Sequence, residues 1–137
     1  MSTRIDMIGI FVQDLQRMVA FYRDVLGFAI EWDGVGPYAE FKQSGVRFSM
    51  YERAQLPQLL GQTPSYPVGL NGTFELAIDL PTPADVDRDF ERAVKAGARP
   101  VYAPRLEPWG MYSSMVADPE GNLIEIGSWN REAQSEA

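Results

Sequence analysis

Residues 74–80 read Phe-Glu-Leu-Ala-Ile-Asp-Leu, so that every second side chain is a large apolar one. This period of two is typical of a β-strand with one face in a core. Apolar residues at helical spacing follow it over 82–97. The same order, an apolar strand at 5–12 and an amphipathic helix at 14–27, opens the chain. The sequence therefore predicts an internal repeat of one structural module.

Each predicted helix has a start and a stop signal. The first begins at Asp14, an N-cap residue type, and ends at Gly27. The second begins at Thr82, with Pro83 in its first turn, and ends at Gly97. After each helix come three short strand candidates separated by turn residues: 28–33, 36–42 and 45–51, then 99–103, 111–117 and 122–127. Each half is thus predicted to be a βαβββ module.

The predicted fold class is α+β. A four-stranded sheet covered by one helix has a second face to bury, so we expect the two sheets to pair around a ligand cavity. The predicted organisation is a single domain over 1–137, with module one at about 4–51, a linker at 52–72, module two at about 73–129 and a polar tail at 130–137. Pro and Gly recur in the linker and are expected to interrupt regular structure. Its length is compatible with three roles, namely a lid, a dimer contact or a plain connector.

Composition narrows the function. With 45% hydrophobic and 23% charged residues, the 137-residue chain suits one compact soluble domain, and the absence of a long apolar run or targeting stretch predicts a cytoplasmic protein. The net charge of −7 disfavours nucleic acid and anionic membranes as partners, and favours a neutral or cationic ligand. The chain has no Cys and no His, which removes the thiolate nucleophile and the commonest general base.

Four short motifs carry a resemblance to a known family: Val-Gln-Asp-Leu at 12–15, Phe-Tyr at 21–22, Leu-Gly-Phe at 26–28 and Asp-Pro-Glu-Gly-Asn-Leu-Ile-Glu at 118–125. With these motifs the chain resembles the vicinal oxygen chelate superfamily, the glyoxalase/bleomycin resistance protein/dioxygenase group, over about 4–129. That superfamily includes glyoxalases, dioxygenases, epimerases, fosfomycin-modifying enzymes and metal-free antibiotic binders. The resemblance implies a homodimer in which modules pair across chains, with pairing inside one chain as the alternative.

The resemblance also implies four metal-ligand positions, which this sequence fills with Met7, Ser49, Glu75 and Glu125. Two carboxylates without nitrogen or sulfur donors make a poor zinc or iron site, and the facial triad of an iron dioxygenase cannot be built. We therefore expect no metal cofactor. A divalent ion such as Mg²⁺, held by Glu75 and Glu125, remains the alternative.

The strand period places the candidate site. Met7 and Phe11 are predicted to face the cavity, whereas Ile8, Ile10, Leu76 and Ile78 are predicted to lie under the helices. Glu75 is expected to lie close to Glu125 across the sheets. These two glutamates are the candidate catalytic pair, because neighbouring carboxylates can share a proton. The predicted ligand-binding residues are Met7, Phe11, Arg47, Ser49, Glu75, Trp109 and Glu125, with Arg47 as a counter-ion to Glu125 or to an anionic ligand.

Two functional hypotheses follow. The first is a metal-free small-molecule-binding protein of the bleomycin-resistance type, whose ligand is aromatic or cationic. The second is a glyoxalase-like lyase or isomerase in which Glu75 and Glu125 hold a divalent metal or shuttle a proton. A third reading is a purely structural or regulatory remnant of the fold, which predicts neither a ligand nor an activity. The sequence does not identify the ligand or decide whether the protein is an enzyme.

Overall fold

A computed structural model describes residues 2–129, and the predicted tail at 130–137 lies outside the described residues. The chain divides into two compact units, Met1–Tyr66 and Pro67–Ala137, which are described separately below. Among the described residues, every helix falls short of the length and apolar character needed to cross a membrane.

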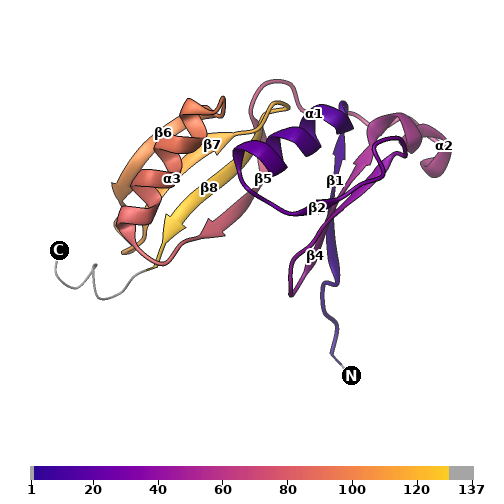
Figure 1. Ribbon diagram of the computed structural model, residues 1–137. Coiled ribbons are helices and arrows are strands. Elements are labelled where there is room, and N and C mark those ends of the chain that lie inside the picture. Colours follow the sequence, from indigo (N-terminus) through magenta and orange to yellow (C-terminus); the bar gives the residue numbers. More distant parts are fainter. Residues whose placement is uncertain (1, 130–137) are drawn as a thin grey trace. The chain divides into compact units, whose positions relative to one another are not determined.

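The first unit holds one four-stranded sheet and its helices (Figure 1). The strand order is β1-β4-β3-β2, in which β1 and β4 run parallel and the other neighbours run antiparallel. Its elements are β1 (Met7–Val12), α1 (Leu15–Ala20), the π-helix η1 (Phe21–Val25), β2 (Ile30–Glu31), β3 (Tyr38–Phe41), β4 (Arg47–Glu52), the 3-10 helix η2 (Arg53–Gln55) and α2 (Leu56–Leu60).

The second unit repeats this plan. Its sheet has the order β5-β8-β7-β6, again with the first pair parallel and the others antiparallel. Its elements are β5 (Asn71–Asp79), α3 (Pro83–Lys95), β6 (Arg99–Leu106), β7 (Tyr112–Ala117) and β8 (Asn122–Ser128). The prediction of two βαβββ modules is therefore confirmed.

The two main helices begin where the sequence predicts. The Asp14 side chain accepts a hydrogen bond from the backbone N–H of Arg17 at 3.0 Å and caps α1. Thr82 caps α3 in a capping box with Asp85, in which each side chain accepts from the other residue's backbone N–H. The first helix differs in one respect, because its hydrogen bonding changes from α to π at Phe21.

The predicted linker at 52–72 is the main difference from expectation. Glu52 still belongs to β4 and Asn71 already belongs to β5, while η2 and α2 occupy 53–60 between them. Pro57 lies in the first turn of α2 and Gly61 follows its last residue with a φ of 71°. These two residues therefore delimit a helix instead of breaking regular structure, since Pro suits a helix start and Gly a helix end.

Helices α1 and α3 each cover one face of their own sheet, and we call the opposite sheet face the helix-free face. Helix α3 contacts β6, β7 and β8, and the side chains of Ile124 and Ile126 beneath it are fully buried. In the first unit the corresponding core is aromatic, with the rings of Phe41 and Phe48 4.4 Å apart between centroids and Tyr22 beside both. Successive strand residues alternate between the helix side and the helix-free face.

One core prediction is wrong. Ile10 is buried as expected, but Ile8 is 44% exposed. Helix α1 contacts mainly β3 and β4, whereas β1 is an edge strand of the sheet. The start of β1 therefore receives less cover than its apolar pattern indicates.

Candidate functional site

The helix-free face of the second sheet carries both candidate catalytic glutamates. Glu75, Ala77 and Asp79 are exposed along β5, whereas the alternating Leu76 and Ile78 are half-buried. The expected orientation of the strand is therefore confirmed. In β8, Ile124 and Ile126 face the helix, so Glu125 between them lies on the helix-free face.

The relation between Glu75 and Glu125 differs from the prediction. The two residues lie on the neighbouring parallel strands β5 and β8 of one sheet, not across two sheets. Ala77 is the register partner of Glu125, so Glu75 is its diagonal neighbour. Residues at this diagonal separation interact through long side chains. Both members of the pair thus come from the second module.

A chain of hydrogen bonds leads to the Glu125 carboxylate. The hydroxyl of Ser113, a fully buried residue of β7, donates to Glu125 Oε2 at 3.0 Å. Ser113 Oγ also lies 2.9 Å from the Tyr102 hydroxyl of β6. A serine hydroxyl has only one hydrogen, so Tyr102 must act as the donor to Ser113. The chain therefore runs Tyr102 to Ser113 to Glu125, and all its hydrogens point toward the carboxylate.

The surroundings of Glu125 favour its protonated form. Partial burial is the main cause that raises its pKa, and the negative charges of Glu75 and Glu107 raise it further. The hydrogen bond from Ser113 acts in the opposite direction, and the net result is a raised pKa. Glu125 is therefore a carboxyl group that holds its proton more readily than an exposed glutamate.

Glu107 is held beside this network by an arginine. Its side chain is buried, and Arg105 Nε donates to Glu107 Oε1 at 2.7 Å. The Arg105 guanidinium also lies 4.0 Å from the centroid of the Tyr102 ring, a cation–π distance. Arg105 thus fixes both Glu107 and Tyr102.

Trp109 lies in the loop between β6 and β7, as the sequence predicts, and is 62% exposed. The loop is closed by backbone hydrogen bonds from Glu107 N to the Met111 carbonyl and from Gly110 N to the Glu107 carbonyl. Trp109 is therefore carried by the same hairpin that positions Glu107. Contact of its ring with a ligand remains a prediction.

The helix-free face of the first sheet carries the other predicted ligand-binding residues. Register pairs Met7 with Arg47, Gly9 with Ser49 and Phe11 with Tyr51, so that these side chains share one face. Met7 and Phe11 are 39% and 46% exposed, whereas Ser49 is buried. A Cβ on Gly9 would approach Ser49 Oγ to 3.1 Å, so glycine leaves room for this serine. The predicted common face is confirmed.

Arg47 has acidic partners within its own unit. Its guanidinium forms ion pairs with Asp6 at 2.8 Å and with Glu40 at 3.2 Å. The hydrogen bonds that its guanidinium donates to both carboxylates hold the pKa of Arg47 above its ordinary value. The sequence did not predict these partners, and the counter-ion role of Arg47 toward Glu125 or an anionic ligand remains a prediction.

The residues at the family's metal positions do not fit a transition-metal site. Met7 and Ser49 belong to the first sheet and Glu75 and Glu125 to the second, and the chain offers no His or Cys donor. Within residues 2–129, no three or more Asp or Glu side chains are grouped to share an ion. Zinc and iron sites usually combine about three protein ligands with nitrogen or sulfur among them. We therefore assign no chemistry to a metal here.

Comparison with known proteins agrees with this architecture. The model of the Glyoxalase/Bleomycin resistance protein/Dioxygenase superfamily matches residues 4–126, and the chain belongs to this family. An uncharacterised protein of Mycobacterium bovis is 34% identical over 125 residues, which cover 88% of this chain and 80% of the relative. The family is thus established, whereas this relative carries no assigned activity.

Solved structures show the same fold. A glyoxalase/bleomycin resistance protein/dioxygenase from Nocardioides is similar with a TM-score of 0.79 and 23% identity, covering 94% of this chain and 85% of that one. A lactoylglutathione lyase from Agrobacterium tumefaciens is similar with a TM-score of 0.71 and 23% identity, covering 93% and 94%. At these identities the likeness shows the fold and not the activity.

Sequence reasoning missed three polar residues of the site, namely Tyr102, Ser113 and Glu107. Tyr102 and Ser113 are brought to Glu125 by the pairing of β6, β7 and β8. The adjacent Ser113 and Ser114 blur the alternation along β7, because Ser114 faces the other way and donates to the Ile126 carbonyl. The strand period alone therefore gave no signal for which serine reaches Glu125.

Proposed function

We propose that this protein binds a small organic cation on the helix-free face of its second sheet, without using a metal ion. The observation that carries the proposal is the environment of Glu125, whose carboxylate is partly buried and lies near the acidic Glu75 and Glu107. Arg105 already pairs with Glu107, so a ligand cation would offset the negative charge of Glu75 and Glu125. In the part of the chain that the structure describes, neither Glu75 nor Glu125 forms an ion pair with Lys or Arg.

The hydrogen bonding around Glu125 supports a ligand with N–H donors. Ser113 occupies Oε2, while Oε1 accepts no hydrogen bond from the residues described. An ammonium or amidinium group can donate to Oε1, and such charge-assisted bonds are stronger than neutral ones. In this proposal Trp109 supplies an aromatic contact, since its exposed ring lies on the hairpin that carries Glu107.

A thermal shift screen tests the proposal. Arylalkyl amines, which are protonated at neutral pH, are compared with neutral and anionic analogues of the same size, on wild type and on Glu125→Gln. We expect cations alone to raise the melting temperature, since a ligand that binds only the folded state stabilises it. Glu125→Gln should weaken binding by about tenfold, the effect of losing one hydrogen bond to a charged group.

Glu91→Gln is the matched control, because Glu91 is exposed on α3 and the substitution removes the same charge. It should leave ligand binding unchanged. Silence across the whole screen, or equal binding of the neutral analogues, would overturn the proposal.

The second candidate function is that of a lyase or isomerase in which Glu125 and Glu75 shuttle a proton. The raised pKa of Glu125 favours it, because acid–base catalysis needs a carboxyl group that titrates closer to neutrality. The test follows by NMR whether the protein exchanges the protons next to the carbonyl group of a small carbonyl compound for deuterium from D₂O. Exchange with wild type that is abolished in Glu125→Ala would support this candidate. If purified wild type instead contains a stoichiometric divalent metal that Glu125→Ala lacks, the enzyme would be metal-dependent.

The homodimer implied by the family resemblance and the cytoplasmic location also remain predictions. Sedimentation of the purified protein over a range of concentrations measures the oligomeric state directly.

A further inference from the structure

We propose that the first module has a ligand site of its own, for a flat organic cation that carries an amidinium or guanidinium group. The site is a pocket of about 420 Å³, within the size range of small-molecule sites. All its lining residues belong to the first unit: Gln13, Asp14, Leu15, Gln16, Trp32, Gly34, Val35 and Glu52. Glu125 is not among these lining residues.

One wall of the pocket is aromatic and held in place. The indole Nε1–H of Trp32 donates to the Gly36 carbonyl at 2.8 Å. The loop after it is closed by Asp33 Oδ1, which accepts from the backbone N–H groups of Val35 at 2.8 Å and Gly36 at 2.7 Å. The ring is therefore oriented before any ligand arrives. Val35, at 88% exposure, adds an apolar surface beside it.

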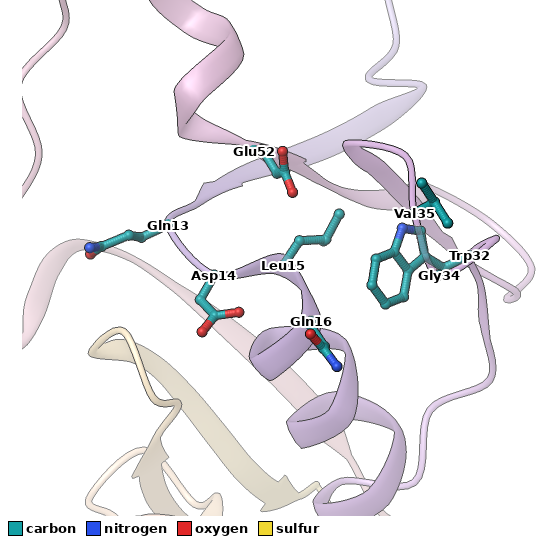
Figure 2. A pocket seen from close by; sticks show the side chains of 8 residues that line it. All are labelled: Gln13, Asp14, Leu15, Gln16, Trp32, Gly34, Val35 and Glu52. Atoms are coloured by element: carbon teal, nitrogen blue, oxygen red, sulfur yellow. The ribbon is translucent and has the colours of Figure 1, made fainter.

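The remaining wall is acidic. In Figure 2 the side chains of Trp32, Glu52 and Asp14 surround Leu15. Glu52 is half-buried, and its carboxylate forms no hydrogen bond or ion pair with the residues that the structure describes. Asp14 shares its carboxylate with the backbone of Arg17, and no lysine or arginine lines the pocket. Glu52 thus supplies the pocket with a carboxylate acceptor for a ligand.

These two walls define the chemistry of the ligand. A planar cation stacks on an indole face more favourably than a neutral ring does. The two parallel N–H groups of an amidinium or guanidinium match the two oxygens of a carboxylate. An anion would instead face two carboxylates. A flat cation that stacks on Trp32 and donates to Glu52 therefore satisfies both walls at once.

Benzamidine is the probe, with benzamide as its neutral analogue of nearly the same shape. Binding is followed on the full-length protein by the indole N–H signal of Trp32 in ¹⁵N–¹H NMR, assigned by its loss in Trp32→Phe. We expect a saturable shift of this signal with benzamidine. Benzamide should bind at least about tenfold more weakly, since it lacks the charge and one of the two NH₂ groups.

Glu52→Gln separates specific recognition from general attraction by an acidic protein. We expect it to weaken benzamidine binding by about tenfold. Glu31→Gln removes the same charge from a nearby residue that pairs with Lys42 and does not line the pocket, and it should leave binding unchanged. Equal weakening by the two substitutions, or no saturable shift in wild type, would overturn the proposal.

Glu125→Gln distinguishes this site from the one proposed above. It should leave the benzamidine shift of Trp32 intact, because Glu125 does not line the pocket. A loss of that shift in Glu125→Gln would contradict a separate first-module site.

Discussion

The two modules have the same strand order in their sheets and differ in the helix that covers each sheet. Helix α3 has 13 residues and a capping box, whereas α1 has 6 residues before it passes into a π-helix. The aliphatic core under α3 has an aromatic counterpart under α1, built around Phe41 and Phe48. The same sheet is therefore compatible with different helices, provided that each core is filled by side chains of matching volume.

The helix-free faces differ more than the cores do. The first presents Met7, Phe11 and an arginine already paired with carboxylates, while the second presents Glu75 and Glu125. Burial and strand pairing hold the backbone of both modules in the same arrangement, while the side chains on the two helix-free faces differ. The two modules thus share a backbone arrangement, whereas the side chains on their helix-free faces differ in polarity and charge.

The largest expected effect concerns two turn glycines that occupy corresponding positions. Gly45 and Gly121 both have a positive φ, 85° and 88°. A Cβ on Gly121 would overlap the carbonyl oxygen of Gly69, whereas a Cβ on Gly45 meets nothing within 4 Å. We expect Gly121→Ala to lower the free energy of unfolding by roughly 3–5 kcal/mol, and Gly45→Ala by about 1 kcal/mol.

Urea denaturation of both variants measures the difference in free energy of unfolding. A Gly121→Ala variant that does not fold at all would also agree with the prediction. Equal losses of unfolding free energy in the two variants would contradict the prediction. They would show that the backbone around Gly121 can move to accommodate the added Cβ.

A smaller effect is expected from Glu125→Gln without ligand. The pKa of Glu125 is raised in the folded protein, so the folded state binds this proton more tightly than the unfolded state does. Its stabilising contribution is present below the ordinary value of 4.5 and is lost as pH rises through the raised pKa. At pH 7 glutamine, which stays neutral, should make the protein more stable by up to about 1 kcal/mol.

The advantage of Glu125→Gln should vanish in acid, where wild-type Glu125 is protonated. Denaturation midpoints at pH 4 and pH 7 measure it, with Glu91→Gln as the control for general charge repulsion. A variant that is less stable than wild type at pH 7 would show that the charged carboxylate is needed by the Tyr102–Ser113 chain.

The smallest effect is expected from Glu75→Gln. Glu75 is exposed and forms no hydrogen bond within the described residues. The free energy of unfolding should therefore change by no more than about 0.5 kcal/mol, while affinity for a cationic ligand falls. The same purified variant is measured by urea denaturation and by ligand titration. Clear destabilisation with unchanged affinity would assign Glu75 a structural role instead of a binding one.

The sequence by itself determined the two modules. The period of two at 74–80, the capping residues Asp14 and Thr82 and the turn at 118–121 each encode a local preference that the structure retains. It also indicated which side of β5 and β8 the glutamates occupy, because alternation follows from strand geometry. Local patterns suffice here, since each depends on residues close to one another in the chain.

Only the tertiary structure decided which polar groups meet. Strand pairing, a contact between distant segments, placed Glu75 and Glu125 side by side in one sheet and brought Tyr102 and Ser113 to the same carboxylate. Likewise, Trp32 and Glu52 line one pocket although 20 positions separate them in the sequence. Such contacts depend on register and on which neighbour a strand selects, and no period along the chain records either.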